Sequence, residues 1–95
     1  MGEAWVYIVT NRPNGILHTG VTSNLARHIW EHRDGIVPGF TQRYGLKRLV
    51  LVERHADIQT AIQREYNMKH WPRTWKVRLI LAANPGWADL YDRIL

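Results

Sequence analysis

Residues 5–10 read WVYIVT and residues 16–21 read ILHTGV, with Pro13-Asn14-Gly15 between them. Both runs are rich in β-branched and aromatic residues, which favour strands. An Asn-Gly pair between two such runs is typical of a tight hairpin. The sequence therefore predicts two neighbouring antiparallel strands at the start of the chain.

The register of this hairpin follows if the Asn-Gly pair forms its tip. Asn11 then lies opposite His18, and Val9 lies opposite Gly20. Because side chains alternate between the faces of a sheet, Tyr7 and His18 are expected to share one face.

The next elements are a helix, a loop and a third strand. Ser23 or Asn24 suits the start of a helix from Leu25 to about Arg33. The segment Ile36–Gly45 mixes Gly, Pro and polar residues, which indicates an exposed loop. Arg48–Glu53 contains a continuous apolar run, which predicts a strand that lies in the middle of the sheet or between two layers.

The second half of the chain is predicted to be helical. Asp57 suits the start of a helix that runs to about His70, and a further helix covers Thr74–Ala83. Ala88–Leu95 is expected to form a short terminal helix. The order of elements indicates an α/β fold in the broad sense, a small antiparallel sheet with helices packed on it.

Composition limits the class of protein. The 95 residues fit one domain, spanning residues 1–95, and the absence of cysteine excludes disulfides, thiolate metal sites and cysteine nucleophiles. Thirteen Lys and Arg against eight Asp and Glu give a net charge of +5, which would strengthen association with a polyanion and makes nucleic acid the leading partner. Many small basic proteins bind nothing specific, so charge alone leaves both interpretations open. No export signal or membrane span is visible, so a cytoplasmic protein is expected.

Four side chains near the hairpin attract attention. Tyr7 suits either a packed sheet position or a functional site, and His18, among apolar neighbours, requires a polar partner if it is buried. His28 and His32 lie one helical turn apart, so both can point toward the sheet. Such a pair more often marks an exposed or hydrogen-bonded helix face than a metal site, and zinc would require His18 or Glu65 as a further ligand.

Glu65 is the most unusual acidic residue of the chain. It falls on the same predicted helix stripe as Ile58, Ala61 and Ile62, which places its carboxylate toward the core or a cleft. A buried anion needs a partner, so two interpretations stand: an ion pair, or a ligand of a hard cation.

Several spaced motifs together resemble the GIY-YIG nucleases, and in particular their small bacterial single-domain branch. The residues that carry this resemblance are Val6-Tyr7-Ile8, His18 to Leu25, Glu31-His32, Pro38 to Thr41 with Arg43-Tyr44, Arg64-Glu65 with Lys69 and Trp71, and Asn84-Pro85 before Trp87 and Asp89-Leu90. They span nearly the whole chain in one order.

The resemblance implies a three-stranded antiparallel sheet flanked by helices, with a catalytic cleft on one sheet face. It implies that Tyr7 orients or deprotonates the attacking water or binds the scissile phosphate, and that Glu65 is the single acidic ligand of one Mg²⁺ or Mn²⁺. It further implies that His32 forms a hydrogen bond in the site and that Asn84 lies near its rim. Gly20 is expected to allow close approach of backbone or substrate.

Two positions depart from the family pattern. His18 stands where the family has its second motif tyrosine, and His28 stands where it has a catalytic arginine. Arg27 is one residue early, which on a helix turns a side chain by about 100°. The hypothesis is that histidine serves at both places, as a base at 18 and, when protonated, as a phosphate-facing cation at 28, with activity falling as pH rises.

The resemblance thus predicts a metal-dependent endonuclease that hydrolyses DNA, suited to repair or processing of DNA structures. The alternative is an impaired domain that binds nucleic acid on the same fold. Candidate phosphate contacts are Arg27, Arg43, Lys47, Lys69 and Arg73. The sequence leaves open whether the DNA is single-stranded, double-stranded or branched, whether RNA is cut, and the oligomeric state.

Overall fold

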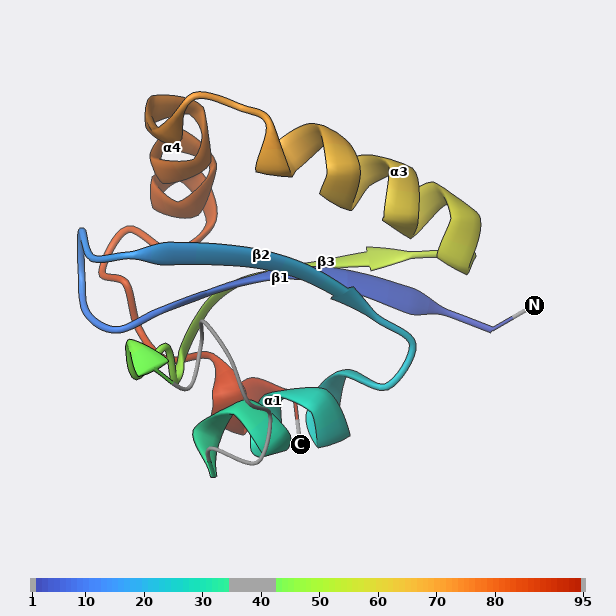
Figure 1. The fold of residues 1–95 in the computed structure, drawn as a ribbon, viewed down its shortest axis with the longest axis horizontal. Helices are drawn as coiled ribbons and strands as arrows, with labels where there is room; N and C mark the ends of the chain where they lie inside the picture. The colour runs from blue at the N-terminus through green and yellow to red at the C-terminus, as the bar shows by residue number, and fades with distance from the viewer. Residues whose placement is uncertain (1, 35–42, 95) are drawn as a thin grey trace.

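The computed structural model describes residues 2–34 and 43–94, and its centre is a three-stranded antiparallel sheet (Figure 1). β1 (Ala4–Thr10) is the middle strand, between β2 (Leu17–Thr22) and β3 (Arg48–His55). The predicted architecture of a small antiparallel sheet flanked by helices is confirmed. Of the predicted loop at Ile36–Gly45, residues 36–42 lie outside the described residues.

Helices cover both faces of this sheet. α1 (Leu25–Arg33) lies on one face, and α3 (Ile58–Lys69) and α4 (Arg73–Ala83) lie on the other (Figure 1). The short 3₁₀ turn η1 (Tyr91–Arg93) returns to the α1 side. No helix among the described residues is long and apolar enough to cross a bilayer.

The helix starts agree with the sequence. The side chain of Asn24 accepts a hydrogen bond from the backbone N–H of Arg27 at 3.3 Å, and that of Asp57 accepts one from Thr60 at 2.8 Å. Each side chain satisfies a backbone donor that the first turn of a helix leaves unpaired.

The predicted hairpin register is wrong by two residues. His18 pairs with Val9 and not with Asn11, and Gly20 pairs with Tyr7 and not with Val9. A shift of two residues leaves every side chain on its face, because the pleat repeats every two residues. Tyr7 and His18 therefore still share a face.

The turn explains this shift. The N–H of Gly15 donates to the carbonyl of Arg12 at 2.9 Å, and Asn14 has a φ of 58°. Pro13 and Asn14 are thus the two corner residues, as in a type II turn, where proline sets the first corner and a positive φ is required at the second. The loop is longer than the two-residue hairpin expected.

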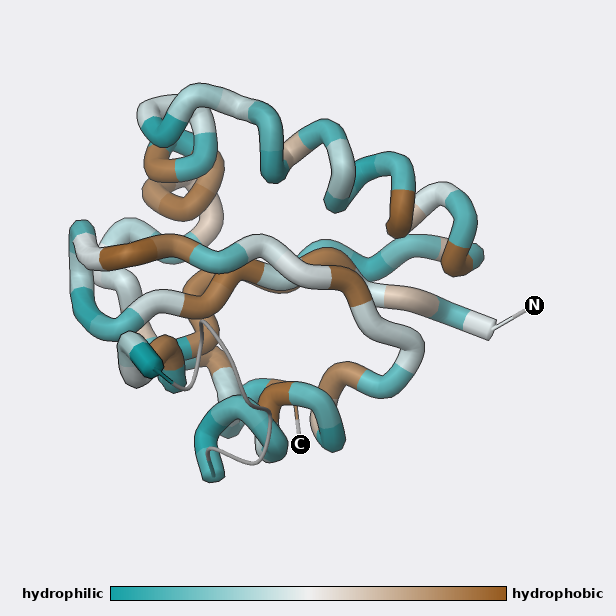
Figure 2. Tube along the Cα trace, in the orientation of Figure 1, coloured by the Kyte–Doolittle hydropathy of each residue, from teal (hydrophilic) through white to brown (hydrophobic). Residues whose placement is uncertain are grey.

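Two hydrophobic clusters pack on the two faces of the sheet. The cluster on the α3 and α4 side consists of Ala4, Val6, Ile8, Val50, Leu51, Ala61, Met68, Ile80 and Trp87. The α1 side holds Tyr7, Val9, Leu25, Ile29, Leu46 and Leu49. Figure 2 shows the hydrophobic colour along the strands, with more polar residues along α1 and α3.

β3 is buried from both sides although it is an edge strand. Leu49 belongs to one cluster, and Val50 and Leu51 belong to the other. The expectation of a strand between two layers is confirmed, and its alternative, a middle strand, is wrong. A strand covered on both faces has apolar residues in sequence and not in alternation.

The stripe expected on α3 is partly wrong. Ala61 and Met68 are buried, whereas Ile58 and Ile62 are exposed. The line that faces the sheet runs through Ala61, Glu65 and Met68, because these positions repeat at helical spacing. Ile58 and Ile62 lie on its flank.

The terminal helix expected over Ala88–Leu95 is reduced to the three residues of η1. The N–H of Leu90 instead donates to the carbonyl of Leu49 at 2.8 Å, and the carboxylate of Asp89 accepts the N–H of Leu49 at 3.2 Å. These long-range bonds fasten the segment to β3 and use groups that a continuous helix would have needed.

Candidate functional site

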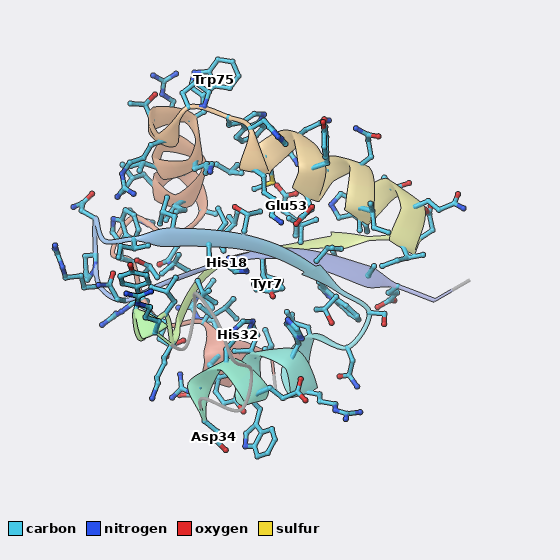
Figure 3. All side chains as sticks on the ribbon, viewed as in Figure 1. Tyr7, His18, His32, Asp34, Glu53 and Trp75 are labelled. Carbon is cyan, nitrogen blue, oxygen red and sulfur yellow. The ribbon has the colours of Figure 1, made fainter. Side chains whose placement is uncertain are left out.

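Four of the predicted site residues meet on the α1 face of the sheet. Tyr7 is only 1% exposed, and its hydroxyl lies 3.2 Å from Nε2 of His32. His18 lies on β2 beside β1, and Figure 3 shows Tyr7 and His18 at the sheet with His32 below them on α1. We call Tyr7, His18, His28 and His32 the tyrosine–histidine cluster.

The rings of this cluster are in mutual contact. Ring centroids are 5.5 Å apart for Tyr7 and His28, 4.7 Å for His28 and His32, and 6.1 Å for His18 and His32. Because His28 and His32 are four residues apart on α1, both imidazoles point to the same place. The sequence prediction that both helix histidines face the sheet is confirmed.

Gly20 makes this arrangement possible. A Cβ at this position would lie 2.4 Å from Cζ and from the hydroxyl oxygen of Tyr7. The close approach expected at Gly20 is therefore made by the ring of Tyr7, which occupies the space that any larger residue would fill.

Glu65 reaches the cluster from the opposite layer. Its side chain is 13% exposed and forms an ion pair with Lys69, with Nζ 2.8 Å from Oε2. Burial and then the negative charge of Glu65 raise the pKa of Tyr7, and the same charge acts on His18. Since α3 packs against β1 and the edge strand β2, the carboxylate of Glu65 lies close to both residues.

Burial sets the protonation of the cluster. It lowers the pKa of His32 to about 4, with further lowering from His28 and His18. It also lowers the pKa of His18, and Lys69 adds to that effect. At neutral pH both imidazoles are therefore neutral, and the phenol of Tyr7 keeps its proton.

Glu31 is a neighbour of the cluster that the sequence reasoning missed. Its Oε1 lies 3.8 Å from Nδ1 of His28, and its Oε2 lies 3.7 Å from Nε of Arg27. The spacings of three and four residues on one helix are the signal that could have revealed both contacts. Glu31 forms an ion pair with His28 only when that imidazole is protonated.

The five candidate phosphate contacts do not form one patch. Lys69 lies at the cluster through Glu65, and Arg27 is exposed on α1. Arg73 donates to the carbonyls of Asn14 and Gly15 at 3.1 and 2.6 Å, which ties α4 to the hairpin loop. A phosphate contact at Arg73 stays a prediction.

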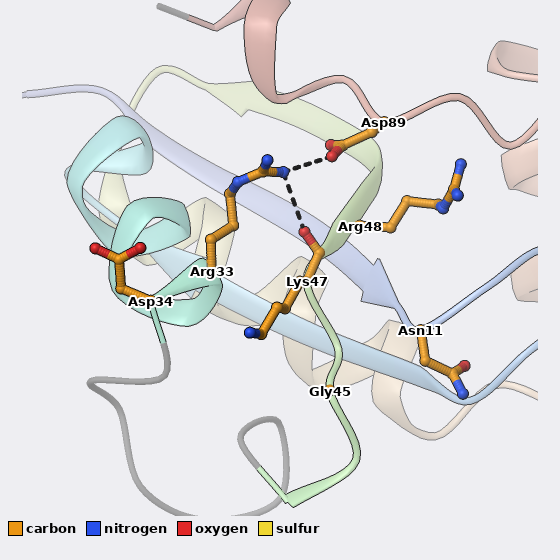
Figure 4. Close-up of a pocket in the computed structure, with 7 residues that line it drawn as sticks. All are labelled: Asn11, Arg33, Asp34, Gly45, Lys47, Arg48 and Asp89. Carbon is orange, nitrogen blue, oxygen red and sulfur yellow. Dashed lines mark hydrogen bonds and ion pairs between the residues drawn. The ribbon is translucent and has the colours of Figure 1, made fainter.

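Lys47 and Arg43 lie at the end of the molecule near the start of β3. Lys47 lines a polar pocket of about 410 Å³, where Arg33 donates to Asp89 and to the carbonyl of Lys47 (Figure 4). The guanidinium of Arg43 lies 5.7 Å from the ring centre of Tyr44. Neither cation is part of the tyrosine–histidine cluster, and the polar pocket includes none of its residues.

Asn84 has a structural use of its own. Its side-chain nitrogen donates to the carbonyls of Val50 and Ala88 at 3.2 and 2.8 Å, and its oxygen accepts the N–H of Ala88 at 3.0 Å. The amide thus fastens the end of α4 to β3. A role at the rim of the site stays a prediction.

The cluster is not a ready-made metal cage. Within residues 2–34 and 43–94, no group of three or more His, Asp and Glu side chains could hold a metal ion. A cation at this site would depend on Glu65 and on ligands beyond those that the described residues offer.

The sequence is similar to a known family and to several curated proteins. It matches the GIY-YIG catalytic domain over residues 3–78. A UPF0213 protein of Orgyia pseudotsugata multicapsid polyhedrosis virus is 38% identical over 84 residues, which cover 84% of this chain and 79% of the relative. A UPF0213 protein of Desulfotalea psychrophila is 33% identical over 89 residues, which cover 93% of this chain and 81% of the relative.

A solved structure agrees with these matches. The solution NMR structure of a UPF0213 protein from Bacillus halodurans is 30% identical, with a TM-score of 0.53, over 88% of this chain and 87% of that chain. The fold is therefore shared with a UPF0213 protein, and the chain belongs to the GIY-YIG family, whose catalytic domain is of the nuclease type and acts on nucleic acid.

Proposed function

We propose that this protein is a metal-dependent endonuclease that hydrolyses DNA phosphodiester bonds at the tyrosine–histidine cluster. The observation that carries the proposal is that side chains from both sides of the sheet act on one another. The negative charge of Glu65 on α3 acts on the pKa of Tyr7 and of His18, which lie on the opposite face of the sheet. A carboxylate beside a protonated phenol and neutral imidazoles supplies the groups that phosphodiester hydrolysis requires.

A single divalent cation fits these residues. Mg²⁺ usually binds one or two carboxylates and completes its shell with water and substrate phosphate, so it needs no cage of protein ligands. Glu65 offers one carboxylate, and its present partner is the half-exposed ammonium of Lys69, which has room to move away. A bound Mg²⁺ or Mn²⁺ would neutralise charge that develops on the phosphate oxygens.

The side chains divide the remaining work. A neutral His18 can accept the proton that the attacking water loses, because the lowered pKa leaves a ring nitrogen unprotonated at neutral pH. Tyr7 keeps its proton and therefore orients water or phosphate by hydrogen bonding instead of acting as the base. His32 fixes the orientation of the Tyr7 hydroxyl through their contact at 3.2 Å.

The missing family arginine leaves the cation role to other groups. His28, with Glu31 3.8 Å away, serves when protonated, and Lys69 serves once it leaves Glu65. If His28 carries this role, cleavage falls as pH rises through the imidazole range, as the sequence-based hypothesis states. A rate that stays flat across that range would contradict this role of His28.

The direct test is cleavage of labelled single-stranded, double-stranded and branched DNA with Mg²⁺ or Mn²⁺. Glu65→Gln keeps the shape of the side chain, removes its charge and is expected to reduce cleavage by about a hundredfold or more. Tyr7→Phe, which removes only the hydroxyl, is expected to reduce it about tenfold or more. Glu3→Gln is the matched control, because Glu3 is an exposed glutamate that pairs with Arg54 away from the cluster.

The outcomes separate the two candidate functions. Cleavage that survives Glu65→Gln would contradict the assigned metal ligand. Binding of DNA by the unaltered protein, with no cleavage under any metal, would favour the impaired nucleic-acid-binding domain.

A further inference from the structure

An aromatic pocket lies on α4, apart from the tyrosine–histidine cluster. It has a volume of about 300 Å³ and is lined by Trp71, Trp75, Arg78 and Leu79. The two indole rings are 5.9 Å apart at an angle of 67°. Trp75 is 51% exposed, and Figure 3 shows it at α4, directed away from the sheet.

The two tryptophans differ in how firmly they are held. Trp71 packs against the apolar cluster, and the guanidinium of Arg64 lies 4.9 Å from its ring centre. Arg64 in turn forms two hydrogen bonds of 2.9 Å with Glu53. Trp71 is thus held in place on one side of the pocket. Trp75 belongs to neither hydrophobic cluster of the described residues. A half-exposed indole adds little to the core, and exposed apolar surface of this kind is typical of a binding site.

The segment of the chain that carries the pocket has charges of one sign. From Tyr66 to Ala88 the chain has four Lys and Arg residues and no Asp or Glu. Lys76 places its ammonium 3.4 Å from the carbonyl of Lys69, and the positive charge of Arg73 contributes to lowering the pKa of Lys76. These cations therefore lie near one another and near Lys69, the partner of Glu65.

This combination suits an unpaired nucleobase better than a protein side chain. Bases present flat π-faces, which stack on indole and guanidinium planes, and their backbone is a polyanion that positive charge attracts. A duplex keeps its bases stacked inside, so it could offer phosphates to the cations but no base to the pocket. A protein partner for this surface would have to be both acidic and apolar.

We propose that Trp71, Trp75 and Arg78 form a binding site for one unpaired base, with Lys69 and Lys76 holding the adjoining backbone between this pocket and Glu65. The inference rests on the proposed nuclease function and defines its substrate class. The preferred DNA carries a single-stranded segment next to the bond that is cut.

The test is the affinity for fluorescently labelled DNA, measured by anisotropy in EDTA so that cleavage plays no part. The probes are a thymine oligonucleotide and a duplex of equal length. Trp75→Ala is expected to weaken binding of the oligonucleotide by about five- to a hundredfold, as loss of one base–aromatic stack does, and to change duplex binding less than twofold. Trp75→Phe keeps a ring and is expected to retain most of the affinity.

Trp30→Ala is the matched control. Trp30 is 46% exposed on α1, on the other side of the sheet, so its removal is expected to leave both affinities unchanged. Far-UV circular dichroism and thermal unfolding establish that each variant is folded. Since Trp75 lies outside the core, folded Trp75→Ala protein is expected.

Each other outcome overturns the inference. Equal losses for oligonucleotide and duplex, equal losses for Trp30→Ala and Trp75→Ala, or no loss at all for Trp75→Ala would remove the base-binding site while leaving the nuclease proposal intact. Failure of the unaltered protein to bind any DNA would instead overturn both proposals.

Discussion

The two faces of the sheet are packed in different ways. On the α3 and α4 side the hydrophobic cluster includes Ala4, Val6, Ile8, Met68 and Ile80. Buried polar side chains on that side, such as Thr19 and Asn84, are not titratable. On the α1 side the same central strand contributes Tyr7, and α1 contributes the buried His32. One strand thus serves an ordinary core with its even-numbered residues and a polar site with an odd-numbered one.

The two faces therefore have different functions: one contributes mainly stability, and the other holds the titratable side chains of the candidate site. Apolar burial stabilises in proportion to the area removed from water, whereas a buried imidazole or phenol must recover its lost hydration through hydrogen bonds. Tyr7 and His32 on the α1 face are nevertheless buried, and this burial raises the pKa of Tyr7 and lowers that of His32. Glu65 links the two faces, because it lies on α3, on the apolar side, and its charge raises the pKa of Tyr7 on the other side.

The largest effect is expected from damage to the apolar face. Met68→Ala removes a fully buried side chain between α3 and the sheet and is expected to lower the free energy of unfolding by about 2–5 kcal/mol, measured with urea. Ile62→Ala on the same helix is exposed and is expected to cost about 0.5 kcal/mol or less. Folded Met68→Ala protein that no longer cleaves DNA would contradict the division between the faces.

The buried imidazole of His32 on the α1 face is expected to lower the stability of the protein in acid. Because the pKa of His32 is about 4 in the folded protein and about 6.5 in the unfolded chain, the unfolded state binds more protons between these values. This contribution to stability is complete above about pH 6.5 and is lost as pH falls toward 4, by up to roughly 3 kcal/mol. The lowered pKa of His18 acts in the same direction.

His32→Asn removes this titrating group and is expected to reduce the difference in unfolding free energy between pH 7 and pH 4.5. The control is His70→Asn, since His70 is exposed at the end of α3. An unchanged pH dependence in the His32 variant would show that burial of this imidazole is not what destabilises the protein in acid.

Gly20→Ala is expected to disturb the contact between strand and tyrosine. The added Cβ would lie 2.4 Å from the Tyr7 ring, so the ring must shift, at a cost of about 1–3 kcal/mol and with loss of cleavage. In the double variant Gly20→Ala with Tyr7→Ala the clash is absent, so the two stability losses should not add. Strict additivity in urea unfolding would contradict the close contact.

The smallest effect is expected at the bridge between the faces. Lys69→Met removes the ammonium that now pairs with Glu65 and competes with a cation for its carboxylate. The affinity for Mn²⁺, followed by its electron paramagnetic resonance signal in the absence of DNA, is expected to rise up to about fivefold, since such pairs contribute about 1 kcal/mol or less. A fall in affinity would mean that Lys69 holds Glu65 in place for the metal.

Much of the fold could be predicted from local sequence. Apolar periodicity and the capping residues Asn24 and Asp57 located the three strands and the three main helices. These signals are local, because each depends on residues within a turn or two of the chain. Tyr7 and His18 also shared a face as predicted, since strand alternation survives a register shift of two residues.

Long-range contacts decided the rest. The C-terminal segment pairs with β3 through Leu49, which no local pattern indicates. Arg73 donates a hydrogen bond to the hairpin loop, 58 residues earlier in the chain, which its residue type does not indicate. The spread of the five predicted cations over separate places has the same cause, because charge in a sequence carries no information on position in space.

Residue type and spacing were enough to predict the family, most of the elements and a set of candidate site residues, because these signals lie in the chain itself. The surroundings of those candidate residues depend on the tertiary structure. It buried His32 against Tyr7, brought Glu65 to them from the opposite layer, and left Trp75 outside the core. The physical reason is that pKa, exposure and contact depend on what surrounds a side chain in space, and most of those neighbours are distant in the chain.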